Sequence, residues 1–146
     1  MTENNAKKSE FFGHRYNIPV ADKMKKEFTA LCEKFGKSFP IREDMSISRR
    51  GVNLYGGRYV NAVIKYMIAE AVRLGRLPFD TTPYYKQGEN AGAYDANIPI
   101  RISVEHKDEF ARICKAEGFK LAGAIRFYVS QCVENQKILV SPEENS

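Results

Sequence analysis

Two short segments, far apart in the chain, repeat the same alternation of apolar and polar residues. In HRYNIPVA, apolar side chains at every second position alternate with Arg15, Asn17 and Pro19. In NIPIRIS, isoleucines at every second position alternate with Asn97, Pro99 and Arg101. This period of two predicts a strand with one buried side and one solvent-facing side. Because a lone strand leaves backbone hydrogen-bonding groups unsatisfied, we expect the two strands to pair with each other.

Two amphipathic helices are predicted after each strand. The segments DKMKKEFTALCEKFG and VNAVIKYMIAEAVRLG, the latter starting at Val60, carry apolar residues at helical spacing and end at Gly36 and Gly75. Asp22 is a candidate cap for the first of them. In the second half, VEHKDEFARICKAEG ends at Gly118 and is followed by the periodic segment LAGAIRFYVSQCVENQ. Each half therefore has the order strand, helix, helix.

The two halves form an internal repeat. The segments EFTALCEKFG and EFARICKAEG superpose without a gap at a shift of 82 residues (114 − 32), which places Cys32 on Cys114. The predicted strands match at the same shift. The second helices match at a shift of 61 (121 − 60), so the first half contains an insertion of 21 residues (82 − 61). This insertion lies between Gly36 and Tyr59 and sets several arginines among Gly and Ser, which predicts a basic loop.

These patterns predict a mainly α fold in which two tandem units pair as an intramolecular pseudo-dimer, with a two-stranded antiparallel ribbon over four helices. The first unit is expected over 13–77, with the basic loop at 37–58, and the second over 96–138. Residues 78–95, rich in Gly, Pro and Tyr, predict a linker. The segments expected to be flexible are the N-terminus 1–12 and the acidic tail 139–146.

The order strand, helix ending in Gly, helix resembles the ribbon-helix-helix fold of the Arc/MetJ-like DNA-binding superfamily, over about 85 of the 146 residues. In that superfamily the ribbon enters the major groove, and the backbone at the start of the second helix contacts phosphates. The resemblance implies double-stranded DNA as the partner and base reading by Arg15, Asn17, Asn97 and Arg101. It also implies phosphate contacts around the starts of the two second helices, from Asn61, Lys120, Ala122 and Gly123. An insertion before the second helix would lie beside the phosphates in this fold, which adds Arg49, Arg50 and Arg58.

Two narrower resemblances bear on the biological role. The stretch VNAVIKYMIAEAVRLGRLPFD is similar to the second helix and LPFD ending of RelB/DinJ-type antitoxins, and two units in one chain resemble the TraY proteins of plasmid conjugation. They imply a transcriptional repressor or an accessory factor in plasmid or phage DNA processing, with a relaxase or a second copy on an adjacent subsite as further candidate partners. The alternatives are an antitoxin-like protein that neutralises a toxin, and a protein-interaction module that has lost DNA binding.

The polar residues of the two strands suit base recognition. Asn pairs bidentately with adenine and Arg with guanine in the major groove, and each such pair contributes roughly 1–3 kcal/mol of discrimination. In the superfamily's register Arg15 lies across from Arg101, which costs stability unless an anion neutralises the pair. Because the two strands differ, the expected DNA subsite is asymmetric. For any one of these residues, an ordinary solvent-facing role is the alternative.

Three features depart from the superfamily pattern. Pro19 and Pro99 cannot donate to a ribbon, so their backbones must point away from the partner strand. The second helix of the second half begins at Lys120 without a Ser or Thr cap. The 37–58 insertion is atypical of the fold.

Charge and composition set broad limits. The chain has 23 basic and 18 acidic residues, a net charge of +5. Residues 1–80 carry 15 basic and 9 acidic side chains (+6), whereas residues 81–146 carry 8 and 9 (−1), so the basic excess lies in the first half. This distribution is compatible with a polyanionic partner.

No enzymatic or cofactor-binding pattern is present in the sequence. His14 and His106 have no metal-ligand spacing around them, and no nucleophile-base arrangement or Gly-rich phosphate loop is found, so we expect no metal, no cofactor and no catalysis. The three cysteines form no CxxC pair, and Cys32 and Cys114 match apolar core positions. No apolar run approaches the roughly 20 residues of a membrane span. A cytoplasmic protein without membrane contact is expected.

Overall fold

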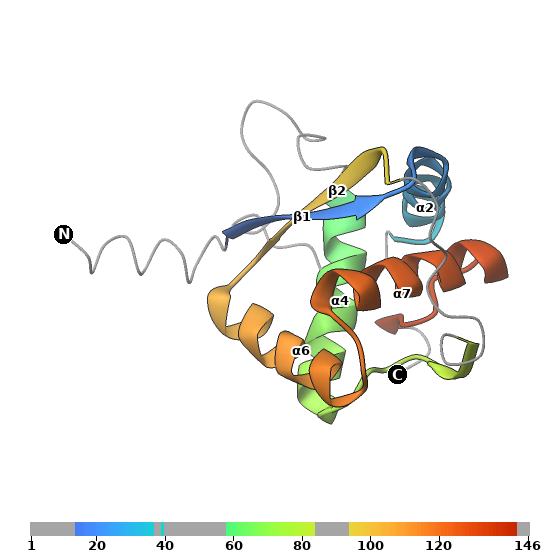
Figure 1. Cartoon of the computed structure of the whole chain (residues 1–146). Helices are drawn as coiled ribbons and strands as arrows, with labels where there is room; N and C mark the ends of the chain where they lie inside the picture. Colours follow the sequence, from blue (N-terminus) through green and yellow to red (C-terminus); the bar gives the residue numbers. More distant parts are fainter. Residues whose placement is uncertain (1–13, 37–38, 40–57, 84–93, 143–146) are drawn as a thin grey trace.

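The computed structural model describes residues 14–36, 39, 58–83 and 94–142 of the chain. The regular elements are, in chain order, β1 (His14–Val20), α2 (Asp22–Phe35), α4 (Arg58–Leu74), β2 (Ala96–Ile102), α6 (Val104–Ala116) and α7 (Leu121–Asn135). The first unit (β1, α2, α4) and the second unit (β2, α6, α7) share one ribbon, which crosses the upper part of the molecule in Figure 1 with α4, α6 and α7 below it. The predicted fold class, mainly α with a two-stranded ribbon built from two strand-helix-helix units, is confirmed.

The ribbon is an antiparallel pair of β1 and β2. Its outward positions pair as Asn17 with Pro99 in the centre, Arg15 with Arg101 toward one end, and Pro19 with Asn97 toward the other. The inward-facing isoleucines and Val20 are buried in the core. The predicted alternation of the two strands and the predicted opposition of Arg15 and Arg101 are both confirmed.

The two units are interleaved rather than placed side by side. The second helix of each unit packs on the strand of the other, α4 on β2 and α7 on β1. The same helices pack on the first helix of the other unit, α4 on α6 and α7 on α2. The buried residues of both units consequently form one hydrophobic core, to which each half contributes surface that the other half covers.

Two side chains from the second helices hold the outer edges of the ribbon. Asn61 of α4 donates from its amide nitrogen to the carbonyl of Pro99 (3.2 Å) and accepts from the backbone N–H of Arg101 (3.0 Å). Arg126 of α7 donates to the carbonyl of Pro19 (3.1 Å). Since the N and C=O of one strand residue point the same way, the missing N–H of each proline faces a helix and not the partner strand. The backbones of Pro19 and Pro99 therefore point away from the partner strand, as the sequence required.

The start of α2 differs from the sequence prediction. Asp22 is the first helical residue, and the N-cap position is Ala21, whose methyl group accepts no hydrogen bond. The carboxylate of Asp95, the residue just before the second unit, accepts from the backbone N–H of Asp22 at 2.8 Å and so supplies the cap. At the matching position of the second unit (21 + 82 = 103), Ser103 caps α6 with its own hydroxyl. The prediction that Asp22 caps the helix was wrong, because the antiparallel ribbon brings Asp95 beside Ala21.

α2 and α4 approach closely where α2 ends. Gly36 has a right-handed backbone conformation (φ −80°), so it does not act as a left-handed helix cap. A Cβ atom on Gly36 would lie 3.0 Å from the Cβ of Tyr59, a contact too tight for most side chains. α4 begins at Arg58, two residues before the predicted start, so Arg58 belongs to the helix and not to the preceding loop.

The repeat continues beyond the second helices. Gly75 and Gln136 occupy matching positions (75 + 61 = 136), and both have left-handed backbones, with φ of 74° and 54°. After them Leu77 and Ile138 turn back into the core, where both are buried. Val140 is buried as well, so the packed structure extends into residues that the sequence assigned to the acidic tail.

The cysteines lie in the core as free thiols. Cys32, Cys114 and Cys132 are all buried, which confirms the core position predicted for Cys32 and Cys114. Burial raises the pKa of all three thiols, to about 12 for Cys114 and about 11 for Cys132. These thiols are therefore protonated at neutral pH.

Some predictions fall outside the described residues. They concern the N-terminus 1–12, the basic loop up to residue 57 apart from Phe39, the centre of the linker at 84–93, and the end of the tail at 143–146. Among the described residues, no helix is long and apolar enough to cross a membrane.

Candidate nucleic-acid interface

The outward-facing positions of the ribbon form a continuous strip, which we call the outer ribbon face. It consists of Arg15, Asn17, Pro19, Asn97, Pro99 and Arg101. Arg15, Asn17 and Asn97 are exposed, Arg101 and Pro19 are half-buried, and Pro99 is buried. The four residues predicted to read bases thus lie on one side of a single ribbon.

A local two-fold relation passes through the centre of the outer ribbon face. Asn17 and Pro99 occupy matching repeat positions (17 + 82 = 99) and also lie across from each other. The same operation matches Arg15 with Asn97 (15 + 82 = 97) and Pro19 with Arg101 (19 + 82 = 101). The strand register is therefore symmetric, although no outward side chain is repeated.

Arg15 and Arg101 place two cationic side chains next to each other. The N–H of Arg101 faces α4, where Asn61 accepts it, so the pair is of the type that exchanges no backbone hydrogen bonds. In such pairs the Cα atoms are about 4.5 Å apart and the side chains are closest. Like charges at this separation destabilise a free ribbon and concentrate positive potential on this end of the outer ribbon face.

The start of α7 lies beside the edge of β1. The first N–H groups of any helix lack partners within it, and the helix dipole adds positive potential there. α7 has Lys120 at its N-cap position and no side-chain cap, as the sequence indicated. Ala122 and Gly123 follow in the first turn, where they are half-buried and buried. Since neither has a polar side chain, both can contribute to anion binding only through backbone N–H groups.

The phosphate-contacting residues predicted in the first unit have different placements. The side chain of Asn61 is 2% exposed, and it binds the backbone of β2. Any contact between Asn61 and DNA would have to come from its backbone. Because α4 begins at Arg58, its first-turn N–H groups belong to residues 58–60. Arg49 and Arg50 lie outside the described residues.

Two further cations lie next to aromatic rings of this region. The Lys107 ammonium is 5.0 Å from the ring centre of Tyr16, and the Arg126 guanidinium is 4.3 Å from that of Tyr94. Neither contact was predicted. The sequence does hold one signal for Arg126, because the repeat matches it with Lys65 and so places a basic residue at the same position of both second helices.

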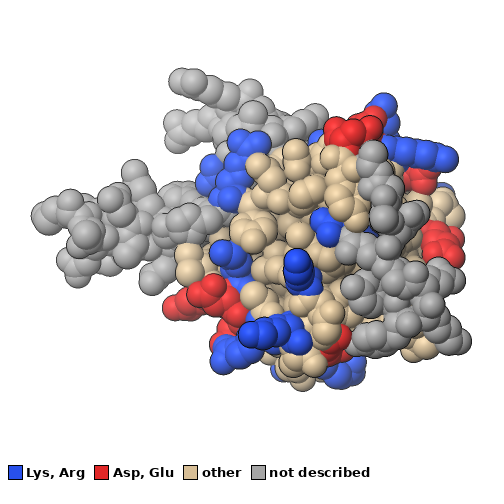
Figure 2. Space-filling model, viewed as in Figure 1, with Lys and Arg blue, Asp and Glu red and all other residues tan. Residues whose placement is uncertain are grey.

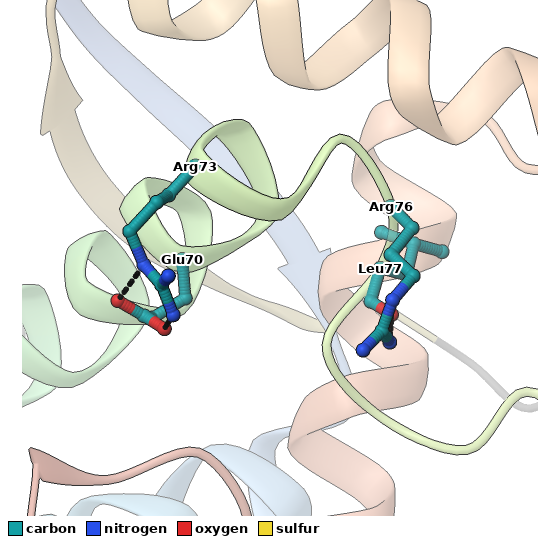
Figure 3. Close-up of polar contacts among 4 residues, drawn as sticks. All are labelled: Glu70, Arg73, Arg76 and Leu77. Atoms are coloured by element: carbon teal, nitrogen blue, oxygen red, sulfur yellow. Dashed lines mark hydrogen bonds and ion pairs between the residues drawn. The ribbon is translucent and has the colours of Figure 1, made fainter. Parts of the chain in front are cut away.

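Basic residues at and just beyond the far end of α4 do not belong to the outer ribbon face. α4 has 17 residues and is about 25 Å long, and the Asn61 contact with β2 lies near its start. Near its end, Arg73 donates two hydrogen bonds to Glu70, of 3.1 and 2.6 Å, and Arg76 lies against the carbonyl of Leu77 (Figure 3). The hydrogen bond from Arg73 lowers the pKa of Glu70, so that pair stays ionised. Part of the basic excess of the first half is thus remote from the ribbon.

Figure 2 shows how the charges are distributed over one face of the described residues. Lys and Arg side chains lie over the left and central part, where Figure 1 shows the ribbon and α6, and also at the upper right, near α2. The Asp and Glu side chains lie mostly nearer the margins, one group of them at the lower left beside the basic side chains. Within the described part of the chain, no group of three or more His, Cys, Asp or Glu side chains is arranged to hold a metal ion.

Comparison of the chain with protein-family models, with curated proteins and with solved structures found no match. The fold and the geometry of the outer ribbon face therefore carry the functional interpretation.

Proposed function

We propose that the protein binds double-stranded DNA in a sequence-specific manner by inserting the ribbon into the major groove, as a member of the ribbon-helix-helix superfamily. The observation that carries this proposal is the register, which puts Arg15 across from Arg101 and sets both on the same outward side as Asn17 and Asn97. These are the side-chain types that pair bidentately with guanine and adenine.

The dimensions of the ribbon fit the groove. The major groove of B-DNA is about 12 Å wide and about 8.5 Å deep, and it admits a two-stranded ribbon. Strands in a pair lie about 4.8 Å apart, which leaves room for outward side chains on both of them. Arg15 and Arg101 lie side by side on the outer ribbon face, and an approaching polyanion offsets the repulsion between their two charges, so the arrangement suits an anionic partner.

In this proposal one set of groups reads the bases and another positions the protein on the duplex. Arg15, Asn17, Asn97 and Arg101 specify bases, while the starts of α4 and α7 fix the register of the protein on the duplex through phosphate contacts. This division requires neither a cofactor nor a catalytic step. It suits a transcriptional repressor or an accessory factor at a plasmid or phage site, and a second copy on an adjacent subsite would extend the site.

The antitoxin-like alternative draws less support from the structure. The LPFD segment that suggested it packs on the protein's own core, with Leu77 buried and the Phe79 ring 5.2 Å from that of Tyr128. Packing within the chain therefore explains this segment without a toxin. Co-purification of a small basic toxin encoded nearby would favour the alternative.

Fluorescence anisotropy on labelled duplexes over a range of salt concentrations tests the proposal. The parent protein should bind a selected duplex with an affinity that falls steeply with salt. Arg101→Ala should reduce the preference for that duplex over random DNA. Arg73→Ala is the matched control, since it removes the same charge at the remote end of α4, and it should leave the preference unchanged. Equal, weak and salt-insensitive binding by all three proteins would reject the proposal.

A further inference from the structure

We infer that the DNA subsite read by this ribbon is directional, with guanine recognition concentrated at the end contacted by Arg15 and Arg101 and adenine recognition at the end contacted by Asn97. This inference rests on the proposed DNA binding and adds to it the orientation of the recognised sequence. It follows from the register together with the repeat.

The local two-fold relation exchanges chemically different residues. Arg15 is matched with Asn97, and Pro19 is matched with Arg101. In a ribbon with identical strands, the same reading residue would occur at both ends and would favour a palindrome. Here both guanidinium groups fall at one end, because the arginines occupy unmatched positions that the antiparallel register brings together.

The prolines add to the chemical difference between the two ends of the outer ribbon face. A proline side chain has neither a hydrogen-bond donor nor an acceptor, so Pro19 can offer a base edge only an apolar contact, such as one to a thymine methyl group. At that end the hydrogen-bonding capacity comes from Asn97, which is exposed. In the centre Pro99 is buried, and Asn17 is the exposed polar partner across from it.

The two ends are far enough apart to contact different base pairs. From residue 15 to residue 19 the strand rises about 14 Å, at roughly 3.4 Å per residue. Base pairs are also stacked about 3.4 Å apart, so this length spans about four of them. Substitutions at opposite ends should therefore change the preference at different positions of the site.

Selection of duplexes from a random library by the purified full-length protein, followed by sequencing, tests this directly. The parent should enrich one non-palindromic motif with guanine preference at one end and adenine preference at the other. Arg15→Ala and Arg101→Ala should both relax the guanine end, each by about 5- to 150-fold in discrimination. Asn97→Ala should relax the opposite end, and Arg73→Ala should leave the motif unchanged.

An exchange variant tests the orientation without changing composition or net charge. Arg15→Asn combined with Asn97→Arg keeps one arginine, Arg101, at the original end and moves the other across the ribbon. We expect one guanine preference to move to the former adenine end. A contact to phosphate, or a purely structural role, would not move a base preference. A far-ultraviolet circular dichroism spectrum matching that of the parent would establish that the exchange variant is folded.

The outcomes separate this inference from the proposed function. If the parent enriches a motif but the two arginine variants relax opposite ends, or the exchange leaves the motif in place, the directional reading is overturned and DNA binding stands. If the parent enriches no sequence, both are overturned.

Discussion

The Asn61 side chain donates to the backbone carbonyl of Pro99 and thereby joins the second helix of the first unit to the strand of the second. The same amide accepts from the N–H of Arg101, so one buried side chain satisfies two edge groups of β2. On the opposite edge Arg126 binds the carbonyl of Pro19. The ribbon is thus held at both edges by the helices that flank it, which fixes the direction of the outer ribbon face.

Asn61→Ala should destabilise the protein by about 1–3 kcal/mol, because a buried carbonyl and a partly buried N–H lose their partner. Urea-induced unfolding measures this change. Asn135→Ala serves as the control, since the Asn135 amide donates to the Gln131 carbonyl at an exposed position, and it should have little effect. Equal stabilities for the parent and Asn61→Ala would contradict the role assigned to this side chain.

Arg15→Asn should stabilise the free protein by roughly 0.2–1 kcal/mol at low ionic strength, because it removes the like-charged partner of Arg101. The gain should shrink as salt is added, since salt screens exposed charges. Thermal unfolding in low and high salt measures both effects. Arg73→Asn should show no such gain, because it breaks an attractive pair with Glu70. A change in stability that is the same in low and high salt would contradict a repulsion between Arg15 and Arg101.

Stability should decline as the pH rises from about 9 toward 11, in part because of the buried thiols. Burial raises the pKa of Cys132 to about 11, above its ordinary value of 9.0. The neutral thiol is favoured in the folded state, so its contribution is complete below pH 9 and is lost as the pH rises through the folded-state pKa. Cys132→Ala should lower stability at neutral pH but flatten this alkaline decline. Measuring the free energy of unfolding across pH 8–11 tests the prediction. The same dependence of this free energy on pH in the parent and in Cys132→Ala would contradict it.

Residues 94–146 alone should not fold cooperatively, because α7 packs on β1 and α2, both of which lie in the other half of the chain. Circular dichroism of this fragment should show low helicity and no sharp thermal transition. Mixing it with residues 1–93 should restore both, since the two pieces together hold all the packed elements. A cooperative transition in the isolated fragment at concentrations where it is monomeric would mean that the halves are independent domains.

The sequence predicted those parts of the fold that follow from local pattern and from the repeat. Alternation at positions 15–20 and 97–102 identified both strands, and the common shift of 82 supported their pairing. The features that the sequence did not indicate depend on contacts between single polar side chains and backbone groups far away in the chain. The cap from Asp95 to α2 and the burial of Asn61 against β2 produce no periodic pattern in the sequence, because each depends on one polar residue. The earlier start of α4 was missed because Arg58 and Tyr59 precede the apolar period.

Site-directed crosslinking to DNA tests the central claim most directly. The native thiols are buried, so a photoactivatable thiol reagent should label the exposed positions in Asn17→Cys and in Ala116→Cys selectively. Position 17 is at the centre of the outer ribbon face, and position 116 is at the far end of α6. We expect efficient crosslinks to major-groove bases from position 17 and none above background from position 116. Crosslinks from position 116 alone, or equally from both, would contradict DNA recognition by the ribbon.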